Sequence, residues 1–177
     1  MPNRATELKA EFMSGLAKHF QEQGFRLRQQ SLTREAGNQR HSIHVNFASS
    51  RDEAAAAIDV AIRHNHVEDA RNATREGRGG RINRETYTLG VELGNWVDGR
   101  RREWTLGTDE DVAAAVQEAA GFAEQFGIPF FERFGSLREV ERTLAEDRRD
   151  AMMICPLRDE RPKILAIVRE SLARGAA

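Results

Sequence analysis

The sequence predicts an α+β fold, in which an antiparallel sheet of four to five strands carries helices packed on one face. Apolar residues recur at every fourth position near the N-terminus, which indicates an amphipathic helix. In the middle of the chain polar and apolar residues alternate instead, as they do in half-buried strands. The last third returns to helical spacing, and segregation of strands from helices is typical of α+β domains. We expect a single domain over residues 1–177.

Length and composition fit a protein that folds without a metal or a disulfide. The chain has 177 residues, of which 40% are hydrophobic and 31% are charged, so it can bury a core and does not have a disordered composition. Its formal net charge of −1 provides no overall attraction to nucleic acid or anionic lipid. No apolar run has the length of a membrane span, and the N-terminus lacks the apolar stretch of a secretory signal. Together with the single cysteine, Cys155, these features favour the cytoplasm.

The first helix is expected over about residues 6–23. Thr6 fits the N-cap position, and Gly24 fits the left-handed residue that often follows a helix C-terminus. The apolar stripe of this helix consists of Leu8, Phe12, Leu16 and Phe20.

Three strand segments follow the first helix. Residues 25–35 alternate at first, but Leu32 has the opposite parity, which predicts a bulge or break near residues 29–31. Residues 40–48 alternate throughout and predict a half-buried strand. Residues 53–66 are ambiguous, because a run of four alanines favours a helix whereas β-branched residues at alternate positions favour a strand. We expect the strand.

A further strong strand is expected over residues 83–96. The pair Asp98-Gly99 then indicates a tight turn, after which residues 101–106 return as a short fifth strand.

The last third of the chain predicts three helices. Capping boxes open the first two, Gly127 and Pro129 end the first, and Pro162 suits the first turn of the third. The capping pairs are Thr108 with Asp111 and Ser136 with Glu139.

Three short segments carry a resemblance to a known family. They are Gly24-Phe25-Arg26, Trp104-Thr105-Leu106 and the stretch IPFFERFGSL at residues 128–137. With the order of the elements over most of the chain, they resemble a family of bacterial proteins grouped as domain of unknown function number four-three-zero-four. The resemblance implies an α+β fold with a strand over residues 53–64, and it brings no activity, cofactor or catalytic residue. The alanine run and the arginine-rich segment 71–84 depart from it.

A glycine-rich segment, residues 77–82, follows a short helix that is expected to begin at Asn65. Glycine loops can hold phosphate through their backbone N–H groups, but a phosphate loop reads GxxxxGK[ST] between a strand and a helix. Here the glycines lead into a strand and no lysine follows, so a plain connection is favoured.

Four of the five histidines occur in two close pairs. A zinc ion needs three or four converging ligands, and in a hairpin of residues 40–48 and 53–66 the two pairs lie far apart. We therefore expect no metal site and no cofactor. Cys155 lies in an apolar stretch, which favours a buried inert thiol over a nucleophile. The histidine pairs are His41 with His44 and His64 with His66.

Arginine clusters are the basis for a nucleic-acid hypothesis. Residues 100–102 form one cluster, and a second lies at the other end of the expected strand 83–96, so the two do not form one compact patch. Nucleic-acid binding is therefore disfavoured. The second cluster consists of Arg71, Arg75, Arg78, Arg81 and Arg84.

The polar face of the sheet is the leading candidate for a binding site. Its side chains combine both charges with hydrogen-bonding groups, which suits a protein partner or a small polar ligand. We predict a non-enzymatic binding domain, of which an immunity-type protein that blocks a toxin is one form. The candidate binding residues are Arg26, Arg28, His44, Asn46, Arg63 and Glu92, with Asp59 and Thr88 on the same face.

Two alternatives stay open. The first is an enzyme whose site is assembled from scattered histidines and carboxylates, with His44 or His64 as general base. The second is binding of nucleic acid through arginines, whose affinity would fall steeply with salt. The sequence predicts neither the oligomeric state nor the identity of a partner.

Overall fold

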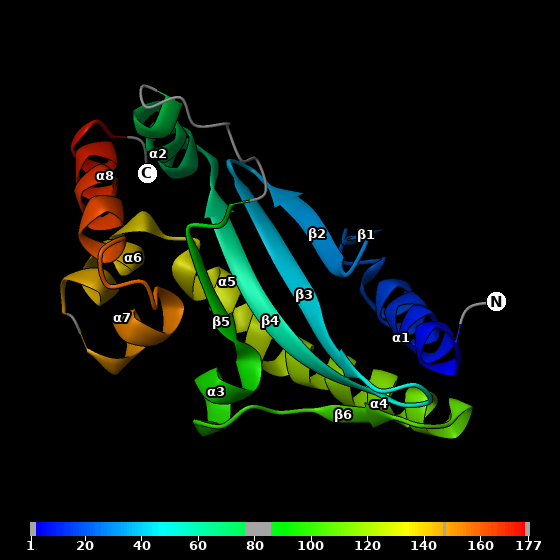
Figure 1. Cartoon of the computed structure of the whole chain (residues 1–177). Helices are drawn as coiled ribbons and strands as arrows, with labels where there is room; N and C mark the ends of the chain where they lie inside the picture. Colours follow the sequence, from blue (N-terminus) through cyan, green and yellow to red (C-terminus); the bar gives the residue numbers. More distant parts are fainter. Residues whose placement is uncertain (1–2, 77–85, 147, 176–177) are drawn as a thin grey trace. The chain divides into compact units, whose positions relative to one another are not determined.

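A computed structural model describes residues 3–76, 86–146 and 148–175 of the chain (Figure 1). It confirms the α+β class, with an antiparallel sheet, an N-terminal helix and C-terminal helices. The strands are β1 (Arg26–Arg28), β2 (Ser31–Ala36), β3 (Gln39–Ser49), β4 (Ala54–His64), β5 (Leu89–Glu92) and β6 (Trp104–Leu106). They are ordered β1-β2-β3-β4-β5, and β6 also pairs with β4.

The helical elements come before, between and after these strands. They are α1 (Arg4–Phe20), α2 (Asn65–Glu76), α3 (Leu93–Asp98), α4 (Asp109–Phe122), the π-helical η1 (Ala123–Gly127), α5 (Ile128–Phe134), α6 (Leu137–Ala145), α7 (Arg149–Ile154) and α8 (Arg161–Ala173). None of the helices in the described ranges is both long and apolar enough to cross a membrane.

The chain divides into two compact units. The first unit consists of Met1–Arg34, Ser42–Val60 and Glu92–Pro129, and the second of Glu35–His41, Ala61–Val91 and Phe130–Ala177. Strands β3 and β4 run through both units, so this division does not test the expectation of one domain.

Helix α1 supplies much of the core of the first unit. Its stripe of Leu8, Phe12, Leu16 and Phe20 is fully buried, as its period predicts. The N-cap is Asn3 rather than Thr6, because the Asn3 Oδ1 accepts a hydrogen bond of 3.0 Å from the Thr6 N–H. Gly24 has φ 82°, which confirms the left-handed residue after the helix.

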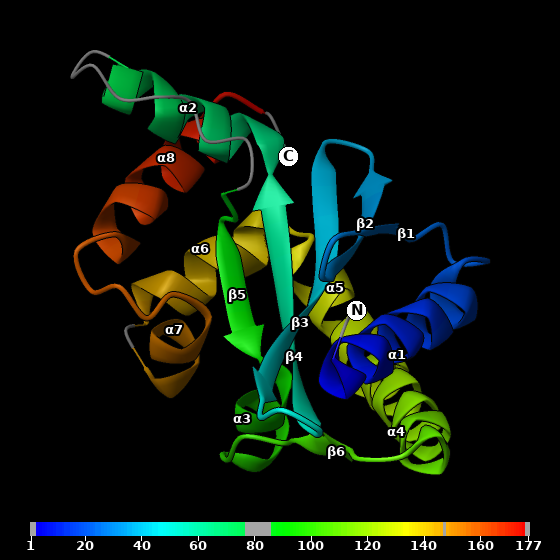
Figure 2. The same ribbon diagram turned by 45° about the vertical axis from the view of Figure 1, so that its right-hand side comes forward.

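Helices α1 and α4 pack side by side in the first unit (Figures 1 and 2). Their contact depends on Gly15, since a Cβ atom at this position would lie 2.7 Å from the Val116 Cγ2. A branched valine has one strongly preferred rotamer in a helix and cannot easily move aside. The two helices therefore approach each other more closely than a side chain at residue 15 would allow.

The segment 25–35 breaks where its parity changes. Two strands, β1 and β2, pair antiparallel with Arg26 opposite Thr33 and Arg28 opposite Ser31. The predicted break is thus a two-residue turn at Gln29-Gln30, with Gln29 at φ 54°. Few residues other than glycine adopt this left-handed conformation, which matches the twist of a tight hairpin.

Residues 54–64 of the ambiguous segment 53–66 form strand β4, which confirms the strand there, and residues 65–66 begin α2. Its inward residues Ala56, Ile58, Val60 and Ile62 are at most 1% exposed. The alanine run lies against β6, with Ala54 opposite Leu106 and Ala56 opposite Trp104. Pairing and burial on this scale outweigh the helix propensity of alanine, which is a weak preference.

The prediction of a long strand over residues 83–96 is wrong, because the observed strand is much shorter. Residues 83–85 lie outside the described residues, β5 covers only Leu89–Glu92, and α3 begins at Leu93. The Glu92 carboxylate causes this change, because it accepts hydrogen bonds from the Gly94 and Asn95 N–H groups and caps the helix. Gly99, at φ 72°, is the left-handed C-cap of α3 and not part of a hairpin turn.

The predicted helix end at Gly127 and Pro129 is also wrong. The helical path continues from α4 through η1 into α5, which ends at Phe134. The Ile128 N–H donates to the Ala123 carbonyl five residues back, as a π-turn requires. Pro129 then falls in the first turn of α5, where its missing N–H does no harm.

The two capping boxes have different outcomes. The pair Thr108 and Asp111 forms one, as predicted. Ser136 is the N-cap of α6, but its side chain makes no capping hydrogen bond. The partner expected for it, Glu139, binds Arg133 and Arg142 instead.

In the second unit, α8 packs against α6 and α2, and α7 packs against α6 (Figures 1 and 2). Helix α7 was not expected from the sequence. Pro162 lies in the first turn of α8, as predicted, and Ile164 and Val168 are the buried side of that helix.

We expect Gly15→Ala to lower the free energy of unfolding by about 1–3 kcal/mol, because the new methyl group would overlap Val116. In an exposed helix the same change is stabilising by roughly 1 kcal/mol. Urea unfolding of Gly15→Ala in the wild-type and in a Val116→Ala background measures both effects. The packing is contradicted if Gly15→Ala stabilises the wild-type background as much as the Val116→Ala background.

Candidate functional site

The six candidate binding residues do not form one open surface. Arg26 and Arg28 are exposed on β1. His44 and Asn46, on β3, are half-buried and already engaged. The His44 Nδ1 lies 2.8 Å from the Ser31 Oγ, and the Asn46 amide donates to the Asp59 carboxylate at 2.6 Å.

The prediction that Arg63 lies on the open face of the sheet is wrong. Its side chain is 6% exposed and donates to the Thr86 carbonyl at 3.0 Å and to the Asp69 carboxylate at 3.0 Å. Thr88, expected on the same open face, is also buried, and its hydroxyl accepts a hydrogen bond from the His64 N–H. Glu92 is occupied as the cap of α3. Strand alternation alone does not show which face is covered, so these side chains were misplaced.

Strand β1 is at an open edge of the sheet in the first unit. It pairs with β2 on one side and ends the strand order. In a two-residue hairpin the pair next to the turn, Arg28 with Ser31, is hydrogen-bonded, so Leu27 and Leu32 form the next, non-hydrogen-bonded pair. The N–H and C=O of Leu27 therefore point away from β2, towards the free edge.

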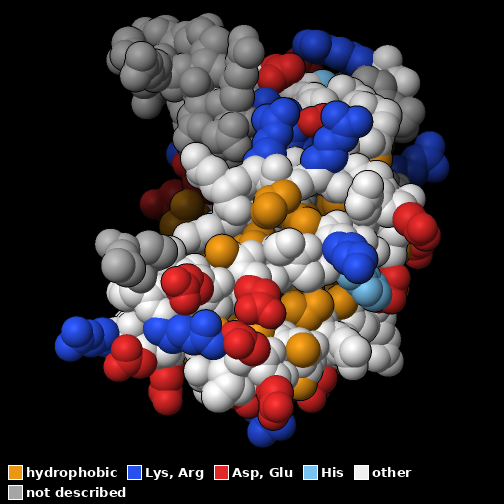
Figure 3. Space-filling view, turned by 90° about the vertical axis from the view of Figure 1, so that its right-hand side faces the viewer, with side chains coloured by type: hydrophobic (Ala, Val, Ile, Leu, Met, Phe, Trp, Pro, Cys, Tyr) orange, Lys and Arg blue, Asp and Glu red, His pale blue; other side chains and the backbone are white. Residues whose placement is uncertain are grey.

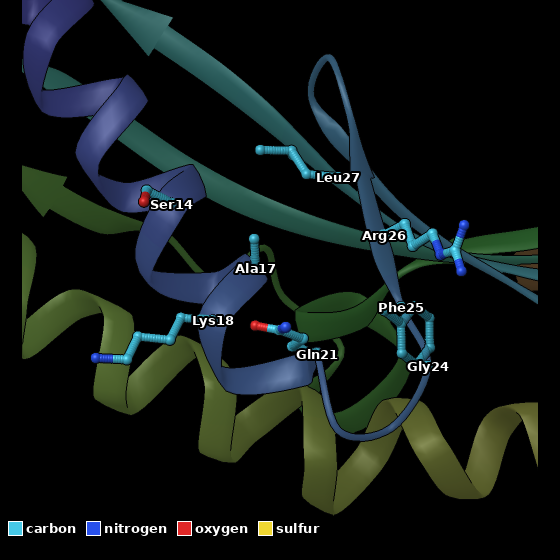
Figure 4. Close-up of a pocket in the computed structure, with 8 residues that line it drawn as sticks. All are labelled: Ser14, Ala17, Lys18, Gln21, Gly24, Phe25, Arg26 and Leu27. Atoms are coloured by element: carbon cyan, nitrogen blue, oxygen red, sulfur yellow. The ribbon is translucent and has the colours of Figure 1, made fainter.

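A cavity of about 660 Å³ lies between β1 and the C-terminal half of α1, within the first unit (Figure 4). Figure 4 shows the Leu27 side chain reaching from β1 towards α1, while Arg26 points to the opposite side. Leu27 is 44% exposed, so its apolar side chain is accessible from solvent. The lining residues are Ser14, Ala17, Lys18, Gln21, Gly24, Phe25, Arg26 and Leu27.

The charged side chains that line the cavity are basic. Arg26 and Arg28 form no ion pair with any residue in the described ranges, and Lys18 lines the cavity. Figure 3 shows the side of the molecule that carries α1 and β1, where hydrophobic side chains reach the surface among side chains of both charges. We call Leu27, Arg26, Arg28 and the adjoining cavity the β1 edge site.

Three of the predicted histidines, His41, His64 and His66, each contact another residue of the second unit. The ring of His41 stacks on that of Phe131 at 4.5 Å, and the His64 Nε2 lies 2.8 Å from the Phe134 carbonyl oxygen. The His66 Nδ1 lies 2.9 Å from the Asn38 Nδ2. Within residues 3–76, 86–146 and 148–175, no group of three or more His, Cys, Asp or Glu side chains could hold a metal ion.

Cys155 is buried, and burial raises the pKa of its thiol. A raised pKa reduces the thiolate fraction, so this thiol is poorly suited to act as a nucleophile.

A buried ionic network joins α2 to α8. The Arg71 guanidinium binds the Glu68 carboxylate at 2.6 Å and the Glu160 carboxylate at 2.7 Å, and Glu68 is fully buried. Hydrogen bonds from Lys163 and Arg71 lower the pKa of Glu160 to about 2. The network occupies Arg71, so this member of the predicted arginine cluster does not offer its charge to a phosphate chain.

The rest of that cluster lies outside the described part of the chain, which excludes the side chains of residues 74–76 and all of residues 77–85. In the other cluster, Arg101 pairs with Glu103, and Arg102 lies over the Trp104 ring at 5.6 Å. The glycine-rich segment 77–82 is likewise not described.

Comparisons with protein-family models, with curated proteins and with solved structures returned no match to this chain. The resemblance to domain of unknown function number four-three-zero-four therefore stays a prediction.

His64 makes folding sensitive to mild acid. Burial lowers the pKa of this imidazole from 6.5 to about 4. The unfolded chain therefore binds a proton between these values that the folded chain does not. The contribution of His64 to the free energy of unfolding is therefore largest above about pH 6.5 and falls by on the order of 3 kcal/mol as the pH approaches 4.

We expect His64→Gln to lose this pH dependence, because glutamine can still donate to the Phe134 carbonyl but does not titrate. Urea unfolding at several pH values between 4 and 7 measures the difference between the two proteins. Equal slopes for wild type and His64→Gln would show that the imidazole is not buried in its neutral form.

Proposed function

We propose that this protein is an interaction domain that binds an extended, acidic segment of another protein at the β1 edge site. The observation that carries the proposal is the open edge of β1, where the outward N–H and C=O of Leu27 adjoin a cavity and two unpaired arginines. Addition of a strand to an exposed sheet edge is a common mode of peptide recognition. The proposal narrows the expected binding surface from the whole sheet face to one edge.

The backbone of Leu27 supports strand addition. An edge residue of a non-hydrogen-bonded pair has one donor and one acceptor free for a new neighbour. A partner residue in extended conformation would make both hydrogen bonds without any change in the β1–β2 hairpin. The gain is modest, since a hydrogen bond that replaces water contributes about 0.5–1.5 kcal/mol.

The cavity beside β1 provides the apolar part of the contact. Alternate side chains of an added strand point to opposite faces. A medium-sized apolar side chain on one face of the partner would lie over Leu27 and Ala17, which line the cavity. Burying the exposed Leu27 would remove apolar surface from water, at roughly 25 cal/mol per Å².

The arginines determine the charge of the partner. Arg26 and Arg28 have the same parity, so both flank Leu27 on the opposite face of the strand. Acidic residues at alternate positions of an added strand would lie near them. Opposite charges across a strand pair stabilise it, whereas like charges destabilise it. An acidic segment is therefore favoured over a basic one.

The enzyme alternative has less support. His44 is engaged by Ser31, and the pKa of His64 is about 4, which makes its imidazole a weak base at neutral pH. A general base functions best with a pKa near the working pH.

The proposal is tested with two short peptides, acetyl-Glu-Val-Glu-Val-Glu-amide and its lysine counterpart, acetyl-Lys-Val-Lys-Val-Lys-amide. We expect the acidic peptide to bind the wild-type protein more tightly, and to shift the amide resonance of Leu27 in an NMR titration. Leu27→Pro removes the outward N–H and should weaken binding by about three- to tenfold. Leu27→Ala is the matched control, because it keeps the N–H and loses only apolar contact.

The double variant Arg26→Glu/Arg28→Glu should reverse the preference and bind the lysine peptide better. Both arginines are exposed, so this variant is expected to fold as the wild type does. Equal binding of the two peptides by the wild type, or an unchanged preference in the double variant, would refute the proposed partner.

A further inference from the structure

A second cavity, of about 540 Å³, lies entirely within the second unit. Three places in the chain form it: the turn between β2 and β3, the junction of β4 with α2, and the junction of α5 with α6. Its lining residues are Asn38, Gln39, His64, His66, Gly135, Ser136, Leu137 and Arg138. None of these residues belongs to the β1 edge site.

His64 lines this cavity, and one of its two ring nitrogens is engaged elsewhere. The Phe134 carbonyl oxygen can only accept, so the His64 Nε2, at 2.8 Å, carries the hydrogen and Nδ1 has a free lone pair. No residue in the described ranges forms a hydrogen bond with Nδ1. His64 is 1% exposed, and its low pKa keeps the ring neutral near pH 7.

His66 has the complementary arrangement. The Asn38 amide nitrogen donates to the His66 Nδ1 at 2.9 Å, so the hydrogen of the neutral ring is on Nε2. That Nε2 is buried and has no hydrogen-bond partner. Buried donors without a partner are rare in folded proteins and often mark a missing ligand or water.

Helix α6 begins at the same cavity. It has nine residues, and its N-cap Ser136 forms no capping hydrogen bond, so the first N–H groups of the helix have no side-chain partner. These groups carry the positive end of the helix dipole and favour an anion. Arg138, which is exposed, adds a full positive charge. The Gln39 amide fixes this junction by donating to the Gly135 carbonyl at 2.6 Å.

The carboxylates of Glu68 and Glu139 are both paired with arginines. Glu68 acts on His64 electrostatically but binds Arg71 at 2.6 Å. Glu139, in the first turn of α6, binds Arg133 and Arg142. Neither leaves an unbalanced negative charge that would repel an anion.

We propose that this cavity binds a phosphate group that retains one proton. Its unprotonated oxygens accept hydrogen bonds from the α6 N–H groups, Ser136, the His66 Nε2 and Arg138, while its P–OH donates to the His64 Nδ1. The free lone pair of His64 makes the site selective. Sulfate has no proton at neutral pH, so it would place an oxygen against this lone pair and form no bond there.

The test is isothermal titration of the full chain with inorganic phosphate, methyl phosphate and sulfate at pH 7 and constant ionic strength. Saturable binding of phosphate, with sulfate at least about tenfold weaker, is the expected result, because a buried acceptor left unpaired is costly. Methyl phosphate that binds as well as phosphate would identify a phosphomonoester as the ligand. Methyl phosphate that fails to bind would identify free phosphate.

Two variants separate the contribution of Arg138 to anion affinity from the contribution of His64 to the preference for phosphate over sulfate. Arg138→Gln changes an exposed residue and should weaken phosphate binding several-fold while leaving the preference over sulfate intact. His64→Gln keeps the donor to Phe134 and removes the acceptor, so it should bring the affinities for the two anions close together. Equal binding of sulfate and phosphate by the wild type, or binding of neither anion at millimolar concentration, would overturn the proposal. The peptide experiment on β1 is unaffected by either outcome.

Discussion

The rest of the sheet depends on the burial and pairing of strand β4. This strand has β3 on one side and both β5 and β6 on the other, and its residues Ala56, Ile58, Val60 and Ile62 are almost completely buried. Its first part holds β6, and its last residue is His64, whose ring donates to the Phe134 carbonyl. A helix over the same residues would have a period of 3.6 instead of 2 and would remove all three strand pairings at once.

Strand β1 is an edge strand of the sheet, and this position explains both its composition and its proposed role. Exposed edges tend to pair with other chains, and proteins protect them with short strands and charged residues. Strand β1 has three residues, two of them arginines. Two copies of this basic edge repel each other, whereas an acidic strand is attracted. The same charges can thus prevent self-association and select a partner.

Local patterns predicted the elements, but not which of their faces are covered. The apolar stripe of α1 and the alternation of β3 and β4 were sufficient to predict these elements, because each of them buries one face with a regular period. Pro129 was misread, since a π-turn before a proline leaves no signal in a single sequence. Arg63 was misplaced because the groups that bind it, Asp69 and the Thr86 carbonyl, come from segments that only folding brings near. The hydrogen bond between His64 and the Phe134 carbonyl, 70 residues away, could not be predicted from a local sequence pattern either.

The central claim is that residues 54–64 are a strand paired with residues 104–106, and backbone NMR tests it most directly. We expect Cα shifts below and Cβ shifts above their random-coil values throughout Ala54–His64. Nuclear Overhauser effects should connect Ala54 with Leu106 and Ala56 with Trp104, as the register requires. Helix-type shifts across the alanine run, with no contacts between these pairs, would contradict the fold and the cavity that His64 lines.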